Sequence, residues 1–166
     1  MPKTILFVCT GNTCRSAMAK GIFRKMLKEA EKENIRLTSA GTIALSGMKP
    51  PREVEEVMKG EGIDISHHRS VPLTRDLIEE ADLVLVMDRC HRQTVLGISP
   101  GASQKTVLLK EFSPDPGEEA LNISDPLGGS LRTYEKAFRE IKRCLEELLK
   151  KVDYYLSTLT GREEHG

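Results

Sequence analysis

The sequence predicts a single-domain α/β protein with a doubly wound, four-stranded parallel sheet, strand order 2-1-3-4, and helices on both faces. Three observations lead to this fold class. A length of 166 residues suits one domain around one core. Continuous apolar runs such as 4–9 and 83–87 are typical of strands buried on both faces. Segments of helical periodicity separate these runs, and such alternation implies parallel strands joined by right-handed crossovers.

The first half of the chain carries two of the expected strands. The run 4–9 is the first strand, and a helix follows it in which apolar residues from Ala19 to Ala30 recur at three- and four-residue steps. Residues 36–40 form the second strand, which Gly41 ends. Parallel sheets bind ligands at the carboxyl ends of their strands, and Cys9 stands at such an end.

The second half repeats the pattern after a loop that contains Gly47. Residues 113–130 are rich in Pro, Gly, Asp and Ser and are expected to form a long, functional surface loop. A flexible tail is expected over 161–166. The elements expected here are a helix over 51–59, a short helix ending at Glu80, a strand over 83–87, a helix over 89–96, a strand over 106–109 and a helix over 130–156.

A short loop between the first strand and the first helix carries the strongest functional signal. Backbone N–H groups in such a loop point into one cavity, and the helix dipole adds positive potential, so the loop forms an anion cradle. Gly11 is expected to supply the backbone freedom that lets the loop curl around a tetrahedral anion. We expect the phosphate-binding residues to be Thr10, Gly11, Asn12, Thr13, Cys14, Arg15 and Ser16.

Two side chains of the cradle supply the chemistry of phosphoryl transfer. Cys9 faces N–H groups and a helix N-terminus, which favour the nucleophilic thiolate. Arg15 lies six positions later, and its planar fork can hold two phosphate oxygens. Ser16 can donate a hydrogen bond to the Cys9 sulfur, and Asn12 can tie the loop together. Of the four cysteines, only Cys9 has an arginine at this spacing, which argues against an ordinary buried cysteine before a turn.

A phosphatase also needs an acid for the leaving group and a base for the water that clears the intermediate. Asp125 lies in the long loop and precedes Pro126, which stiffens its approach. An Asp-Pro pair is also common at helix entries. Beside a cradle of this kind, we expect Asp125 to be the third catalytic residue, with Cys9 and Arg15.

The segments 9–16, 39–41, 84–88 and 125–126 together resemble low-molecular-weight protein tyrosine phosphatases over nearly the whole chain. The resemblance implies a metal-free and cofactor-free enzyme with a four-stranded parallel sheet. It implies Cys9 as nucleophile, Arg15 as phosphate clamp and Asp125 as general acid and then base. It also implies a reversible disulfide between Cys9 and Cys14 under oxidation, with simple packing as the alternative role of Cys14.

Two departures from the eukaryotic members bear on the substrate. Thr13 replaces a bulky aliphatic residue, and 127–129 reads Leu-Gly-Gly where aromatic residues are usual. Both features resemble the bacterial protein-arginine phosphatases of the family. A hydroxyl suits a planar, cationic guanidinium, and Asp125 can pair with it, so Thr13 and Asp125 are the expected substrate-selecting residues; in the other interpretation Thr13 only fills the loop.

Other functions remain open at this level. Phosphotyrosine proteins are the main alternative substrate. Arsenate reduction needs two further well-placed cysteines, and the chain offers Cys90 and Cys144, which we expect to be packing residues. An inactive phosphoprotein-binding module and a flavodoxin-like electron carrier belong to other classes; the complete set of reactive residues and the sparse aromatics (4%) argue against them.

Composition limits the partners. Equal numbers of basic and acidic residues, 25 each, give no global attraction for nucleic acid or an anionic membrane. No stretch reaches the apolar length that spans a bilayer, and the N-terminal apolar run is too short for a signal peptide. We therefore expect a cytoplasmic monomer that acts on phosphorylated proteins. His67 and His68 lack further metal ligands and are expected in a solvated or hydrogen-bonded turn.

Overall fold

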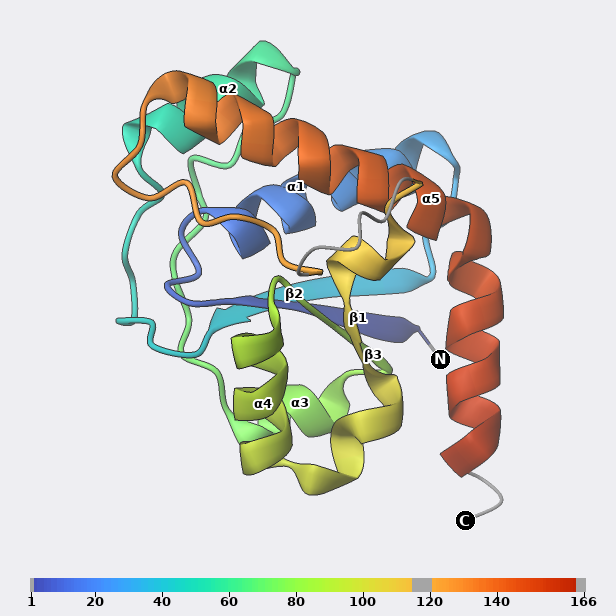
Figure 1. Cartoon of the computed structure of the whole chain (residues 1–166). Coiled ribbons are helices and arrows are strands. Elements are labelled where there is room, and N and C mark those ends of the chain that lie inside the picture. The colour runs from blue at the N-terminus through green and yellow to red at the C-terminus, as the bar shows by residue number, and fades with distance from the viewer. Residues whose placement is uncertain (1, 115–120, 164–166) are drawn as a thin grey trace.

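Four parallel strands form the centre of the computed structural model, which describes residues 2–114 and 121–163 (Figure 1). Their order is β2-β1-β3-β4, as predicted. β1 (Lys3–Cys9) pairs with β2 (Ile35–Gly41) on one side and β3 (Leu83–Val86) on the other, and β4 (Thr106–Leu108) completes the sheet. Since the chain adds β2 on one side of β1 and β3 on the other, the topological switch point lies between the ends of β1 and β3.

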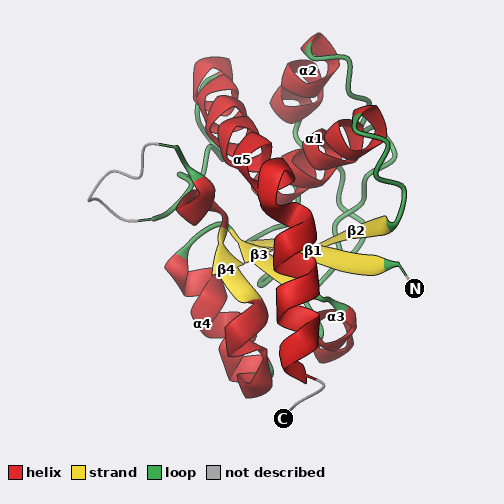
Figure 2. Cartoon of the chain, turned by 90° about the vertical axis from the view of Figure 1, so that its right-hand side faces the viewer, coloured by secondary structure: helices red, strands yellow, loops and turns green. Residues whose placement is uncertain are grey.

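Helices cover both faces of this sheet, as predicted, and Figure 2 shows the two layers on either side of it. The described elements also include two 3₁₀ helices beside β4, which the sequence analysis missed because such short turns carry no periodic pattern. One layer contains α1 (Arg15–Glu29), α2 (Arg52–Gly60) and the first half of α5 (Leu131–Glu163), and the other contains α3 (Arg75–Glu80) and α4 (Arg89–Ile98). The C-terminal half of α5 runs past the sheet to the level of the second layer. The 3₁₀ helices are η1 (Pro100–Lys105) and η2 (Leu109–Phe112).

The apolar run of β1 is continuous because both of its faces are buried. Ile5, Phe7 and Cys9 belong to the core beneath α1 and α5, whereas Leu6 and Val8 belong to the core on the opposite face. β3 alternates between the two cores in the same way. A strand with two buried faces cannot slip by one residue without exchanging its two sets of side chains, so the position of Cys9 at the end of β1 is fixed.

The last helix, α5, is longer than predicted. It was expected to end near 156, with a flexible tail from 161, but it continues to Glu163; residues 164–166 lie outside the described residues. Leu159 continues the apolar stripe onto the core, which explains the extension. Although α5 is long enough to cross a bilayer, it is too rich in charged residues, and none of the described helices qualifies as a membrane span.

The predicted long loop before α5 is described only in part. Residues 115–120 of it lie outside the described residues. The remainder returns to the carboxyl end of the sheet, where the buried Ile123 donates its backbone N–H to the carbonyl of Met87, 2.8 Å away. This bond places the segment that contains Asp125 at the same edge as Cys9.

Candidate active site

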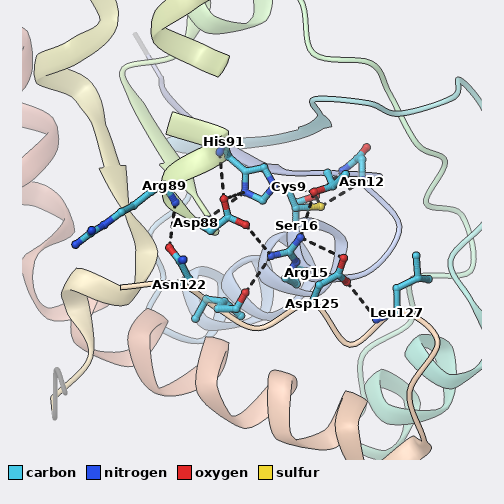
Figure 3. Close-up of polar contacts among 12 residues, drawn as sticks. Cys9, Asn12, Arg15, Ser16, Asp88, Arg89, His91, Asn122, Asp125 and Leu127 are labelled. Atoms are coloured by element: carbon cyan, nitrogen blue, oxygen red, sulfur yellow. Dashed lines mark hydrogen bonds and ion pairs between the residues drawn. The ribbon is translucent and has the colours of Figure 1, made fainter. Parts of the chain in front are cut away.

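The Cys9 thiol is held between two hydrogen-bonding groups at the end of β1 (Figure 3). Its Sγ lies 2.9 Å from the Ser16 hydroxyl oxygen and accepts the Asn12 backbone N–H at 3.3 Å. The side chain is buried, and α1 begins six residues later at Arg15. The expected contact between Ser16 and the sulfur is therefore present. An N–H and an O–H aimed at one sulfur stabilise it as a thiolate.

Asn12, not Gly11, supplies the special backbone conformation of the cradle. Asn12 has a φ of 57°, in the left-handed region, whereas Gly11 does not lie there, so this detail of the prediction was wrong. Asparagine tolerates the left-handed region better than other non-glycine residues. Its side chain then ties the loop on both sides, since Nδ2 donates to the Ser16 hydroxyl at 2.8 Å and Oδ1 accepts the Val71 N–H at 2.9 Å.

Neighbouring segments brace the cradle from outside. At the end of β2, a Cβ built on Gly41 would lie 2.5 Å from the Thr10 carbonyl oxygen, so only glycine allows this close approach. The Asn12 carbonyl accepts a hydrogen bond from His68 Nε2 at 2.7 Å. His68 thus lies in a hydrogen-bonded turn, as expected, but its contact with the cradle, 56 residues away in the chain, could not be read from the sequence.

The Arg15 guanidinium is buried (3% exposed) and held along one edge. Its Nη1 donates to the Ile123 carbonyl at 2.9 Å and lies 3.4 Å from Asp88 Oδ2. Its Nη2 donates to the Thr10 hydroxyl at 3.3 Å. Within the described chain, Nε–H has no recorded acceptor. The edge formed by Nε and Nη2 is therefore the one available to two oxygens of a bound phosphate.

Asp125 faces this guanidinium from the opposite wall of the site. Its Oδ2 lies 3.6 Å from Arg15 Nη2, and its Oδ1 accepts the Leu127 backbone N–H at 3.1 Å. The carboxylate is 47% exposed, far more than Arg15. Gly128 follows with a φ of 81°, so the turn after the acid requires glycine or a close substitute. The structure brings the three expected catalytic side chains, Cys9, Arg15 and Asp125, to one place.

Asp88 and His91 join the site from the start of α4. Asp88 caps the helix and forms a capping box with His91. Two contacts of these residues were not expected from the sequence: that of Asp88 with Arg15, and the 2.8 Å contact between His91 Nε2 and the Thr10 hydroxyl. One signal was available, because Asp88 directly follows β3 and the carboxyl ends of neighbouring parallel strands meet at one edge.

The other cysteines differ sharply in environment. Cys14 is buried beside the Thr13 hydroxyl, and burial, opposed by the hydrogen bond from Thr13, raises its pKa to about 11. Cys144 is buried in the core, and its pKa is also raised to about 11 by burial. Cys90, expected to pack, is exposed on the first turn of α4, because that face of the helix carries no core contact. In the described part of the chain, no group of three or more His, Cys, Asp or Glu is placed to hold a metal ion.

A thiol at the mouth of an N–H cradle, with a buried guanidinium and a carboxylate across from it, defines a cysteine-dependent phosphatase. Residues 4–157 match the family described as low molecular weight phosphotyrosine protein phosphatase. The chain therefore belongs to the low-molecular-weight protein tyrosine phosphatase family, and the resemblance seen in the sequence is confirmed.

Similar proteins carry two kinds of name. The protein-arginine-phosphatase of Bacillus subtilis is 37% identical over 89% of this chain and 95% of its own length. The probable low molecular weight protein-tyrosine-phosphatase EpsP of Ralstonia nicotianae is also 37% identical, over 92% of this chain and 97% of its own length. Overall identity therefore does not separate the two activities.

Solved structures agree with the fold. The YwlE arginine phosphatase of Geobacillus stearothermophilus superposes with a TM-score of 0.80 at 33% identity and covers 99% of this chain and 98% of its own. A cysteine-to-serine mutant of a YwlE arginine phosphatase, with a phosphorylated active-site serine, has a TM-score of 0.82 at 35% identity and covers 90% of this chain and 95% of its own.

Proposed function

We propose that this phosphatase removes phosphate from phosphoarginine in proteins through a cysteinyl-phosphate on Cys9. The observation that carries the substrate assignment is the character of the pocket wall: a threonine, Thr13, in the cradle and no aromatic residue in the described part of the Asp125 loop, 121–130. The two arginine phosphatases among the similar proteins support the assignment. The substrate partner is a phosphorylated protein.

In the first step, the Cys9 thiolate attacks phosphorus and forms an S–P bond while the P–N bond to the substrate breaks. Asp125 gives its proton to the departing guanidine nitrogen. The free edge of Arg15 and the cradle N–H groups hold the equatorial oxygens, where charge develops. The phosphorylated active-site serine of the YwlE mutant supports a covalent intermediate at this position.

In the second step, water attacks phosphorus, Asp125 takes a proton from that water, and the S–P bond breaks. The leaving thiolate is the same sulfur that Ser16 and the Asn12 N–H contact at 2.9 and 3.3 Å. These two donors favour its departure as an anion and restore the starting state. Asp125 thus ends the cycle protonated again: its first proton left with the guanidine, and the attacking water supplied the second.

The pocket wall favours a guanidinium over a phenyl ring. Among the described residues, the tyrosine near the loop that carries Asp125 is Tyr134, which is buried (2% exposed) and cannot stack on a phenol. Leu127 is exposed on that loop, and a single aliphatic side chain gives little ring stacking. Asp125 offers a partly exposed carboxyl group, which can accept a guanidinium N–H and still donate its own proton, and the Thr13 hydroxyl offers a polar contact and a place for the hydrolytic water.

The deciding experiment compares phosphate release from a phosphoarginine protein and a phosphotyrosine peptide by wild type and Thr13→Ile. We expect wild type to prefer phosphoarginine and the variant to lose or invert that preference, by about tenfold or more. Thr94→Ile, at an exposed threonine of α4, is the matched control and should keep the wild-type ratio. A wild-type preference for phosphotyrosine would assign the enzyme to the tyrosine phosphatases.

We also propose that Cys14 protects Cys9 from over-oxidation. Peroxide oxidises the Cys9 thiolate to a sulfenic acid; the Cys14 sulfur then attacks it, water leaves, and a disulfide forms that a thiol can reduce. After peroxide and then dithiothreitol, wild type and Cys90→Ser should recover activity, whereas Cys14→Ser should not. Equal recovery of Cys14→Ser would reduce Cys14 to a packing residue.

A further inference from the structure

The Thr10 hydroxyl sits at the junction of three elements that form the active site. It belongs to the cradle, lies 2.8 Å from His91 Nε2 at the start of α4, and accepts a hydrogen bond from Arg15 Nη2 at 3.3 Å. The same Nη2 lies 3.6 Å from Asp125 Oδ2, so the hydroxyl is next to the atoms that surround a bound phosphate.

The capping box fixes the tautomer of His91. The Asp88 backbone N–H donates to His91 Nδ1 at 3.1 Å, so Nδ1 carries a lone pair and no hydrogen. A neutral imidazole then carries its hydrogen on Nε2. His91 is neutral at physiological pH, since burial and the nearby Arg15 cation lower its pKa to about 4 against the opposing effect of Asp88 and Asp125. Nε2 is therefore a donor, and the Thr10 oxygen is its acceptor.

The bonding of Thr10 then leaves one choice for its hydroxyl hydrogen. A hydroxyl has two acceptor lone pairs and one donor hydrogen. His91 Nε2–H and Arg15 Nη2–H occupy both lone pairs. Across residues 2–114 and 121–163, the Thr10 hydroxyl has no further recorded partner. The hydroxyl hydrogen is therefore available to a further acceptor, such as an oxygen of a phosphate held by the cradle.

We propose that His91 is a positioning residue that acts through Thr10: it holds the hydroxyl so that its hydrogen is donated to an oxygen of the bound phosphate. This inference rests on the proposed function, because it adds a donor to the same phosphoryl-binding site. The same hydroxyl also holds one N–H of Arg15 Nη2, which keeps the free edge of the guanidinium facing the cradle. One hydroxyl thereby contacts both groups, because it donates to the phosphate and accepts from the Arg15 clamp.

Two substitutions of His91 separate the cap from the positioning role. Asparagine can place an acceptor near the position of Nδ1 and keep the cap, but it does not reach Thr10. Glutamine can place a donor near the position of Nε2. We expect His91→Asn to fold normally yet to bind inorganic phosphate about tenfold more weakly and to lose a similar factor in kcat on an aryl phosphate, with His91→Gln recovering part of the loss. His67→Asn, at an exposed histidine, is the matched control.

A double-mutant cycle tests whether His91 works through Thr10. Thr10→Val should weaken phosphate binding by about tenfold, and Thr10→Ser should restore it. Adding His91→Asn to Thr10→Val should cost nothing further, because the hydroxyl that His91 positions is already gone. Multiplicative losses in the double variant, or unchanged phosphate affinity in His91→Asn, would overturn the proposal.

Calorimetric binding of inorganic phosphate keeps this test separate from the proposed function. If wild type released phosphate from neither a phosphoarginine protein nor a phosphotyrosine peptide, the proposed function would fail. The double-mutant cycle, measured by phosphate binding, would still test whether His91 acts through Thr10. If turnover were normal and Thr10→Val bound phosphate as well as wild type, the proposed function would stand and this inference would fall.

Discussion

The two walls of the active site are built in opposite ways. On the cradle side, Asn12, Arg15 and Ser16 are almost completely buried, and their polar atoms are bonded to several elements. On the acid side, Asp125 is 47% exposed and Leu127 is 65% exposed, and within residues 2–114 and 121–163 the carboxylate has one local hydrogen bond and one long ion pair. The cradle is therefore preorganised for phosphate, which every substrate carries, whereas the open acid loop meets the part of the substrate that varies.

The largest effect is expected at the nucleophile. Cys9→Ser should reduce turnover to background, because a serine hydroxyl is a much weaker nucleophile toward phosphorus than a cysteine sulfur. The rest of the cradle is intact, so the variant should still bind inorganic phosphate. Steady-state kinetics and calorimetry measure the two properties. Cys90→Ser provides the control and should keep full activity; activity surviving in Cys9→Ser would contradict the mechanism.

A smaller effect is expected at the acid. Asp125→Asn should lower kcat by about 10²- to 10⁴-fold, with the greater loss for leaving groups that need a proton. Phosphate affinity should be retained, because the cradle does not depend on the carboxylate. Rates on a series of aryl phosphates of different leaving-group acidity test this. A loss that is uniform across the series would argue against a proton donor at this position.

Stability should distinguish the two walls as well. Arg15→Gln should lower the free energy of unfolding by about 3 kcal/mol, because it leaves Asp88 and the Ile123 carbonyl without their buried cation. Asp125→Asn, on the open wall, should change it by about 0.5 kcal/mol or less. Urea unfolding with unchanged m-values gives both numbers. Equal losses would mean that the acid loop is as integral to the fold as the cradle.

The last effect is expected in the pH dependence of the free energy of unfolding, and it comes from His91 on the buried wall. The pKa of His91 falls from 6.5 to about 4 on folding, so between these values the unfolded chain binds more protons than the folded one. The free energy of unfolding therefore rises with pH, and the contribution of His91 is lost as pH falls from about 6.5 to about 4, on the order of 2–3 kcal/mol. His91→Asn should flatten this part of the stability curve relative to wild type and His67→Asn. Parallel curves for all three would contradict it.

The sequence was sufficient for the parts of the molecule that local patterns encode. Continuous apolar runs predicted the sheet, and the spacing of Cys9 and Arg15 between a strand and a helix predicted the cradle. Details that depend on distant contacts were missed: the left-handed residue is Asn12, not Gly11, because the Asn12 side chain also bonds Val71. Periodicity carries no information about pairings such as Arg15 with Asp88, 73 residues apart.

The Ile123 carbonyl that orients Arg15 has a consequence for how such enzymes diversify. It is a main-chain group, so no side-chain replacement at position 123 removes it. The orientation of the Arg15 guanidinium therefore depends little on which side chains occupy the segment that follows. Substitutions at 127–130, in evolution or in a randomised library, can therefore change which leaving groups are accepted while the protein keeps its phosphate-binding site. A main-chain atom thus maintains the catalytic reaction, whereas side-chain atoms of the following segment can change the substrate.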